Sequence, residues 1–381
     1  MKTLALAVTL LATSLGLAPQ TAPPQTGTWT ARLQDTWTRN NGERWVSFQL
    51  EQDTSRRYGM SIAIEDLQGL GARDEFWTSP GTVRFSVMRD AGEVDFEGTF
   101  SGGRGSGTYR FTPRGDYVQA MAKAGYRNLD TDALFRLTLH DVSRSFVASI
   151  QAAGYQNVEL EDLIRMRIHG VDADYITGLR EAGYAQLSIE DLVRTRIHGA
   201  TPAYVRELRA SGYTGLSVED LVRMRIHGVT PDFIREMRDM GYAKLPAEEL
   251  VRLRIHGATP QFIRSMRDLG FKDLGMNEAV QMRIHGVTAE FVKELRGLGY
   301  NDLDVDDLVK MRIHGVTPQY IKELRDLGYG GLSADRLVQF RIHRVTAEFI
   351  RDAKAAGFKN LDADDLVDMS IHGRRWLAKR D

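Results

Sequence analysis

The sequence repeats itself every 29 residues, and this period constrains the fold more than any other feature. Nine glycines keep the interval, from Gly125 to Gly357, and each is followed by Tyr or Phe. A fixed period of this length is the signature of a solenoid, in which each unit buries its apolar face against its neighbours. All nine histidines of the chain fall on the same period: His140, His169, His198, His227, His256, His285, His314, His343 and His372.

Each unit predicts two short helices joined by turns. In one unit the first helix begins at Thr230-Pro231, an N-cap residue followed by proline at the first helical position, where the missing N–H costs nothing. Gly241 ends this helix as a left-handed residue, and Tyr242 supplies the hydrophobic contact of a Schellman ending. Leu245 then plugs the turn. The predicted apolar stripe of this helix consists of Phe233, Ile234, Met237 and Met240.

The second helix is clearest in the preceding unit. There, a segment that begins at Ser217 and ends at Asp220 resembles a capping box with Asp in place of Glu, and Gly228 stops the helix after His227. Helices of about ten residues do not persist alone, so neighbouring units must bury their stripes against each other. The predicted stripe of the second helix consists of Val218, Leu221, Val222 and Ile226.

The two ends of the repeat region depart from this pattern. The opening unit has Thr138 where the inner units carry Arg, and Asp141 where they carry Gly. The closing unit has Ser370 in the Arg column, and residues 374–376 (Arg-Arg-Trp) replace the next Val-Thr-Pro. Polar departures at both ends are typical of units that cap a stack. We therefore expect an all-α solenoid of nine αα-hairpins over residues 115–381.

Residues 28–114 alternate apolar and polar side chains with the period of β-strands. The glycine-rich run 101–107 lacks the lysine and the following helix of a phosphate loop, so we interpret it as a hairpin turn. Six short strands suit a small all-β domain, either an antiparallel barrel or a sandwich. The clearest predicted strands cover residues 44–50, 57–64, 82–89, 93–100 and 108–112.

The N-terminus resembles a secretory signal peptide. Met1-Lys2 precedes an apolar run over residues 4–18, which is short for a membrane span. We expect a signal peptide over residues 1–22, a Pro-rich extended linker over 23–27, and a periplasmic or secreted protein. An uncleaved N-terminal anchor is the alternative, and no later segment is apolar enough to span a bilayer.

Composition excludes several kinds of site. The chain has no cysteine, which excludes disulfide frameworks, thiolate nucleophiles and Cys-based zinc or iron–sulfur sites. Its 50 basic and 51 acidic residues leave a net charge of -1, so no global field recruits nucleic acid or an anionic membrane. No catalytic grouping stands out from the repeat. We predict no catalytic residues, no cofactor and no metal.

The histidines are nevertheless candidates for a functional role. Neighbouring histidines would lie about 9–10 Å apart, too far to share a zinc ion whose ligands converge at about 2 Å. We interpret each imidazole as bonding terminal carbonyls in the last turn of its helix. The alternative is a pH-sensitive stack in which several histidines become charged together near neutral pH.

A column of arginines precedes the Ile-His pairs. Because these arginines lie near the apolar stripe, each guanidinium must find carboxylates or carbonyls at a repeat interface. A ladder of such bridges is the structural interpretation, and a row of arginines facing a groove for carboxylate or phosphate ligands is the alternative. The candidate ladder comprises Arg167, Arg196, Arg225, Arg254, Arg283, Arg312 and Arg341, with His169, His198, His227, His256, His285, His314 and His343.

Two further basic columns predict solvated faces that carry salt bridges. Glu followed by Arg four residues later is a favourable pair on a helix, so we expect these bridges within single helices. One column contains Arg180, Arg209, Arg238, Arg267, Arg296 and Arg325; the other contains Arg165, Arg194, Arg223 and Arg252, preceded by Glu161, Glu190, Glu219 and Glu248.

The recurring string Met-Arg-Ile-His-Gly-Val-Thr-Pro-x-[Phe/Tyr]-Ile, at residues 224–234 and 311–321, resembles short helical repeats of uncharacterised exported bacterial proteins. Similar strings stand behind membrane metallopeptidase domains of the β-lactam-sensor type. The resemblance covers about residues 116–373. It implies no activity, because the zinc-binding helix of the peptidase is absent from this sequence.

These observations favour an exported, non-enzymatic protein that binds or scaffolds other proteins of the bacterial cell envelope, since solenoids present extended surfaces. We expect protein partners and no nucleic acid. One alternative is a sensor whose β domain holds a small molecule, which requires a hollow interior. Another is an enzyme that acts on anionic substrates in a groove of arginines and histidines. The loop position just after the repeated aromatic residue varies from unit to unit and could give each unit its own contacts. These positions are Ala185, Thr214, Lys272, Asn301 and Gly330.

Overall fold

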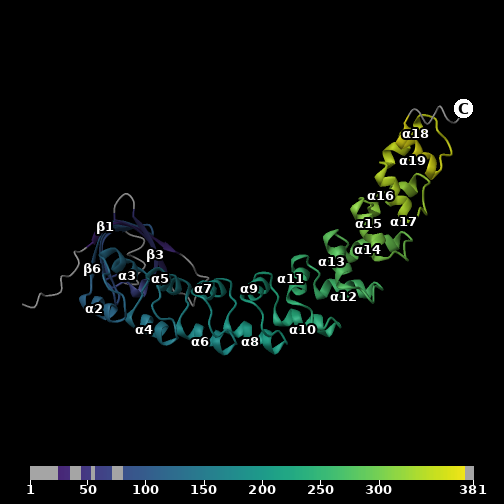
Figure 1. Ribbon diagram of the computed structural model, residues 1–381. Helices are drawn as coiled ribbons and strands as arrows, with labels where there is room; N and C mark the ends of the chain where they lie inside the picture. Colours follow the sequence, from purple (N-terminus) through teal and green to yellow (C-terminus); the bar gives the residue numbers. More distant parts are fainter. Residues whose placement is uncertain (1–24, 35–43, 53–55, 71–79, 374–381) are drawn as a thin grey trace, which may run out of the picture. The chain divides into compact units, whose positions relative to one another are not determined.

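The computed structural model describes residues 25–34, 44–52, 56–70 and 80–373. Within these residues an antiparallel β-sheet precedes eighteen α-helices, which form nine hairpins (Figure 1). The predicted β domain and helical repeats are therefore confirmed. The chain divides into two compact units, one ending at Ile197 and the other beginning at His198, so the first three hairpins belong with the sheet. The predicted signal peptide and residues 374–376 lie outside the described residues.

All six strands pair antiparallel in the order β3-β2-β1-β6-β5-β4. The first strand begins at Gln25, and Gly27 already pairs with Tyr109, so the linker predicted over residues 23–27 is wrong from residue 25 onward. After β3, Gln68 exchanges two backbone hydrogen bonds with Ser86 of β4, at the other end of the strand order. The sheet is thus curled into a barrel rather than split into a sandwich. The strands are β1 Gln25–Gln34, β2 Trp45–Glu51, β3 Arg57–Ala63, β4 Gly81–Met88, β5 Gly92–Ser101 and β6 Arg104–Pro113, with the 3-10 turn η1 Ile64–Asp66 after β3.

Trp29 fills the centre of this barrel. Its indole lies over two glycines of neighbouring strands, Gly107 and Gly98, and a Cβ on Gly98 would stand 2.7 Å from the Trp29 ring. The indole N–H donates to the carbonyls of Glu97 (3.2 Å) and Thr108 (3.1 Å). Ring centroids within 5.5–6.0 Å of Trp29 belong to Phe48, Phe85, Phe96 and Phe100. The described interior is therefore packed with aromatic rings.

The first helical hairpin joins the barrel through one phenylalanine. This hairpin consists of α2 Gly115–Lys123 and α3 Thr131–Leu139. Phe135 of α3 is fully buried and contacts the rings of Tyr58, Tyr109 and Phe111 at 5.1–5.4 Å between centroids. The first hairpin is thus part of the core of the β domain and not a separate cap.

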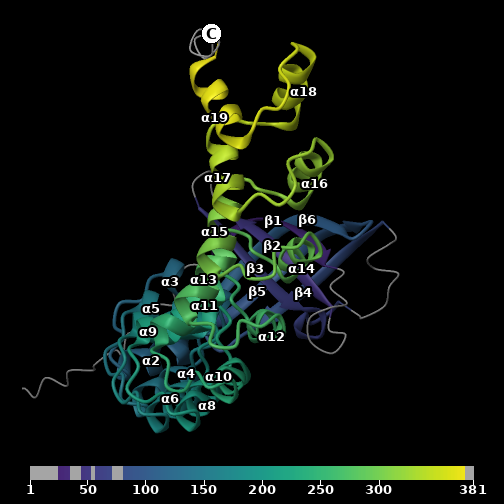
Figure 2. The same cartoon turned by 90° about the vertical axis from the view of Figure 1, so that its right-hand side faces the viewer.

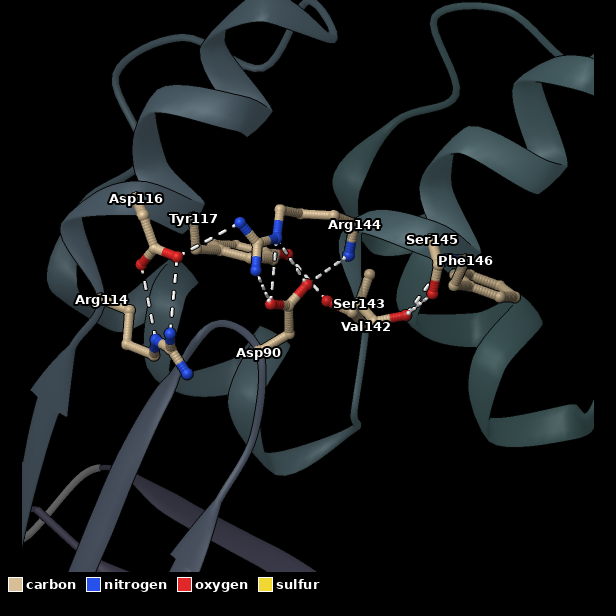
Figure 3. A network of polar contacts seen from close by, with 9 residues as sticks. All are labelled: Asp90, Arg114, Asp116, Tyr117, Val142, Ser143, Arg144, Ser145 and Phe146. Carbon is tan, nitrogen blue, oxygen red and sulfur yellow. Dashed lines mark hydrogen bonds and ion pairs between the residues drawn. The ribbon is translucent and has the colours of Figure 1, made fainter.

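A polar network fastens the same hairpin to the next helix (Figure 3). The guanidinium of Arg144, at the start of α4, donates to Asp90 in the β4–β5 turn (2.5 Å) and to Asp116 of α2 (3.2 Å). Its backbone N–H also donates to Asp90 (2.7 Å). Burial alone would raise the pKa of Asp90, but the hydrogen bonds and charge of Arg144 outweigh it and lower that pKa. Tyr117 donates its hydroxyl proton to the carbonyl of Val142 (2.8 Å).

Within each compact unit the helices form two rows (Figures 1 and 2). In the second unit each even-numbered helix contacts the next even-numbered one, and each odd-numbered helix contacts the next odd-numbered one. The first unit adds α4 Arg144–Ala152, α5 Leu160–His169, α6 Ala173–Glu181 and α7 Ile189–Ile197. The second unit contains α8 Pro202–Ala210, α9 Val218–Ile226, α10 Pro231–Asp239, α11 Ala247–Ile255, α12 Pro260–Asp268, α13 Met276–Ile284, α14 Ala289–Gly297, α15 Val305–Ile313, α16 Pro318–Asp326, α17 Ala334–Ile342, α18 Ala347–Ala355 and α19 Ala363–His372.

The helix ends confirm the predicted local chemistry. The Thr230 hydroxyl accepts from the N–H of Phe233 (3.1 Å) at the start of α10. At the other end Gly241 has φ 90°, and the N–H of Tyr242 donates to the carbonyl of Met237 (3.0 Å), as a Schellman ending requires. Ser217 caps α9 by accepting from the N–H of Asp220, and Leu245 is buried in the turn. The five variable loop positions are exposed and outside helices, as expected.

Candidate functional site

An exposed isoleucine stands at the end of every second helix from α5 onward. In α9 the prediction that Ile226 belongs to the buried stripe is wrong: its exposed fraction is 53%, whereas Leu221, Val222 and Met224 are buried. Met224, three residues after Leu221, occupies the core position instead. The equivalent isoleucines, 49–54% exposed, are Ile168 and Ile197 in the first unit and Ile226, Ile255, Ile284, Ile313, Ile342 and Ile371 in the second. We call the six in the second unit the isoleucine row.

The isoleucine row is unusual because large apolar side chains at such exposure need a reason. One exposed isoleucine is ordinary, but the same exposure repeated on adjacent helices forms an extended apolar strip. Among the described residues, Met88 on β4 is the other large apolar side chain with comparable exposure. The strip lies on the odd-numbered helices, each of which contacts the next in the second unit.

The predicted arginine ladder is present and engages both a ring and a carbonyl. Arg254 lies over the Phe233 ring, with its guanidinium carbon 5.2 Å from the centroid, and its Nε–H donates to the carbonyl of His227 (3.2 Å) in the preceding hairpin. Arg341 does the same with Tyr320 and His314. Similar cation–π contacts of 4.9–5.8 Å are made by Arg167, Arg196, Arg225, Arg283 and Arg312.

This arrangement explains the glycine that follows most of the histidines. Gly228 has φ 68°, and a Cβ there would stand 2.8 Å from a guanidinium nitrogen of Arg254. The glycine therefore serves both a left-handed backbone and the close approach of the next arginine. The last two hairpins depart at both positions together: Arg344 replaces the glycine of one, and Ser370 replaces the arginine of the next. The Ser370 hydroxyl then donates to the carbonyl of His343, so a shorter donor makes the same bond.

The histidine imidazoles do not act as predicted. It is the histidine carbonyl that is bonded, by the arginine of the next hairpin. Within the described part of the second unit the imidazoles take part in no hydrogen bond or ion pair. They are half-buried or exposed and stand next to the isoleucines. In the first unit, burial and the charge of Arg136 lower the pKa of His140.

The basic column of the first helices was interpreted wrongly as a solvated face. Arg267 of α12 donates to the carbonyl of Met240 (2.9 Å) at the end of α10. Its guanidinium carbon lies 5.1 Å from the centroid of the Tyr242 ring. Arg180, Arg296 and Lys354 donate to the carbonyls of Ala153, Leu269 and Leu327 in the same way. Each cation meets the negative end of a neighbouring helix, so this column is a second ladder between hairpins.

The salt bridges of the column that contains Arg165 and Arg252 join neighbouring hairpins or residues three apart, and not residues four apart. Arg165 pairs with Glu190 of the next hairpin (2.6 Å), 25 residues later, and not with Glu161. Glu161 pairs instead with Arg136 of the preceding hairpin. In the second unit Arg336 pairs with Asp364 (2.6 Å). The predicted acid–base matching is therefore real, but the partners lie in the neighbouring unit or three residues away on the same helix.

A tyrosine contact between hairpins was not predicted. The Tyr213 hydroxyl donates to the carbonyl of Leu245 (2.7 Å), 32 residues later, in the turn of the next hairpin. Tyr300 makes the same bond to Leu332 (2.7 Å). The aromatic residue after the glycine was a visible signal, but its hydroxyl partner depends on the stacking of hairpins.

Two hollows in the described residues bear on the alternative functions. The packed barrel interior removes the support for a ligand inside the β domain. An open hollow of about 800 Å³ lies on the outer, polar face of the sheet, where Arg84 already pairs with Glu97 (2.8 Å). In the second unit a hollow of about 410 Å³ lies between the turns at Tyr213 and Tyr242. Neither brings together a catalytic grouping.

Metal and membrane features are limited to what the described residues contain. In those residues no cluster of three or more His, Asp or Glu side chains could hold a metal ion. The described helices also include none that is both long and apolar enough to cross a bilayer. Arg254, Arg312 and Arg341 each direct one N–H to a histidine carbonyl of the preceding hairpin.

Comparison with known proteins adds no identity. No model of a known protein family matches the chain. No curated protein matches it in sequence either.

Proposed function

We propose that the chain is an exported, non-enzymatic interaction protein of the cell envelope, which uses the isoleucine row to bind protein partners. The observation that carries this proposal is the repeated exposure of isoleucine, about half of each side chain, on adjacent helices. Covering such a strip removes apolar surface from water, at about 25 cal/mol per Å². The two ladders support the proposal, because they hold the hairpins in a fixed stack that presents the strip.

The test is affinity capture from envelope extracts with matched variants. The full-length chain and a Met88→Ser variant, which removes a comparably exposed apolar side chain off the row, should retain the same proteins. An Ile284→Ser/Ile313→Ser variant should lose them, with an unchanged circular dichroism spectrum. Equal capture by the row variant and the wild type would contradict the proposal.

Export is a separate part of the proposal and has its own test. The apolar run after Lys2 supports it. A β-lactamase reporter fused after residue 27 should confer resistance, because the enzyme protects cells only outside the cytoplasm. Replacing two leucines of the run by arginine should abolish this resistance. Resistance that survives the replacement would count against export through this segment.

A further inference from the structure

We infer that the isoleucine row and the histidines beside it bind an extended polypeptide in the polyproline II conformation, with an apolar residue at every third position. This inference rests on the proposed function and names the partner of the same surface. The isoleucines of the row and the turns of a polyproline II chain repeat at similar distances. The row offers one isoleucine per hairpin, and each odd-numbered helix of the second unit contacts the next.

The spacing of the row fits three residues of an extended chain. Helices packed side by side lie about 8–10 Å apart, which sets the distance between successive isoleucines. A polyproline II chain has three residues per turn and rises about 3.1 Å per residue, so residues i and i+3 lie on one face about 9.3 Å apart. Such a chain laid across the helices therefore meets one isoleucine with every third side chain.

The histidines supply what an extended backbone lacks. A polyproline II chain has no internal hydrogen bonds, so its carbonyls need donors from the surface that binds it. Every isoleucine of the row is followed directly by a histidine, from His227 to His372. In the described part of the second unit these imidazoles have no partner within the protein. Each hairpin thus offers one imidazole donor and one isoleucine. Each triplet of the extended chain presents one carbonyl and one apolar side chain to them.

The charges around the row favour an uncharged segment over a basic one. Arg252 pairs with Glu249 on its own helix (3.3 Å), and Arg336 pairs with Asp364. The guanidinium groups beside the isoleucines are engaged with histidine carbonyls and aromatic rings. These contacts are with neutral groups, so the guanidinium groups keep their positive charge and the row disfavours a basic segment. An α-helix is a poorer fit, because its carbonyls are already bonded within the helix and cannot accept from the imidazoles.

The first experiment compares peptides that differ only in spacing. Fluorescein-labelled peptides of five Pro-Pro-Leu triplets and of four Pro-Pro-Pro-Leu quartets are titrated with the full-length chain, and anisotropy gives the Kd. The triplet peptide should bind at least about tenfold more tightly, because only it keeps a leucine on each isoleucine. Its affinity should also rise from three to five triplets. Equal affinities for the two spacings would overturn the inference.

The second experiment assigns the binding to the row. Ile284→Ser/Ile313→Ser should weaken binding of the triplet peptide about tenfold or more, whereas Met88→Ser should leave it unchanged. His285→Leu should weaken binding, and His285→Gln, which keeps a donor, should restore part of it. Binding that survives the isoleucine replacements would overturn the inference. So would a sedimentation result in which the wild type dimerises through the row and excludes the peptide.

These outcomes separate the inference from the proposed function. If the extract proteins are lost with the row variant but no spacing preference is found, the row binds proteins in another conformation and only the inference fails. If the extract proteins are retained by the row variant, the proposed function itself fails.

Discussion

The barrel of the first unit and the hairpin stack of the second unit are stabilised in opposite ways. Trp29 reaches Thr108, 79 residues away, and its place over the glycines occurs once in the structure. Arg254 reaches His227, 27 residues away, and the same kind of contact recurs along the stack. The barrel depends on a few distant contacts. The stack depends on many similar contacts between neighbours.

This difference predicts how a single substitution affects the stability of each region. A barrel closed by long-range pairing forms cooperatively, since loop closure must precede its contacts. A stack of repeats has a stability close to the sum of its hairpins and their interfaces. A single substitution should therefore unfold the barrel as a whole but weaken the stack only locally.

The largest expected effect is that of Trp29→Ala. Removing the indole leaves a cavity among four phenylalanines and should cost about 3–5 kcal/mol. Chemical denaturation followed by aromatic circular dichroism reports the barrel, and the signal at 222 nm reports the helices. The barrel transition should move to lower denaturant, and the main helical transition should stay. Trp45→Ala, at a half-buried residue of β2, is the control with a smaller cost. Equal shifts of both transitions would contradict the comparison.

Two glycines in the second unit test how much the stability of the stack depends on contacts between neighbouring hairpins. Gly228 and Gly215 both have φ 68°, but only Gly228 lies against an arginine of the next hairpin. Replacement by Ala should cost about 1 kcal/mol at Gly215 through the left-handed backbone alone. At Gly228 the cost should be about 2 kcal/mol, because Arg254 must also leave the His227 carbonyl. Urea denaturation at 222 nm measures both, and equal costs would show that the ladder contributes nothing.

A smaller effect is expected from the paired departure at the end of the stack. Arg344→Gly removes a left-handed non-glycine residue (φ 54°) and should stabilise by up to about 1 kcal/mol. Ser370→Arg alone should destabilise, since the new guanidinium would stand near the like charge of Arg344. The double variant restores the inner pattern, and a double-mutant cycle should give a favourable coupling of about 0.5–1 kcal/mol. A coupling of zero would mean that the two departures are independent.

The sequence predicted what local rules determine. The 29-residue period, the caps at Thr230 and Ser217, and the glycine endings depend on residues within one turn, and all were confirmed. The place of Trp29 could not be predicted, because it depends on the register of β1 against β6 and of β6 against β5. The register of β1 against β6 joins segments about 70 or more residues apart, beyond any local rule.

The errors in the candidate site have one cause. Helical periodicity alone puts Ile226 near the buried stripe, and the four-residue rule pairs Arg165 with Glu161. In the stack the next hairpin is as close as the next turn, so Met224 takes the core position and Arg165 pairs with Glu190. The neighbouring unit determines how deeply a side chain is buried and which group it pairs with. The residue pattern within one helix predicts neither.

The smallest expected effect concerns pH and returns to the first unit. Burial, followed by the charge of Arg136, lowers the pKa of His140 in the folded state. The unfolded chain therefore binds a proton at this imidazole more readily than the folded chain does. The contribution of the neutral imidazole to folding stability is thus present above the ordinary histidine pKa of about 6.5 and is lost as pH falls below it. His140→Gln should flatten the loss of thermal stability of the first unit between pH 7 and 5. His227→Gln, in the second unit, is the matched control for removing an imidazole. If the wild type and His140→Gln lose stability in parallel over this range, the pH dependence comes from other groups.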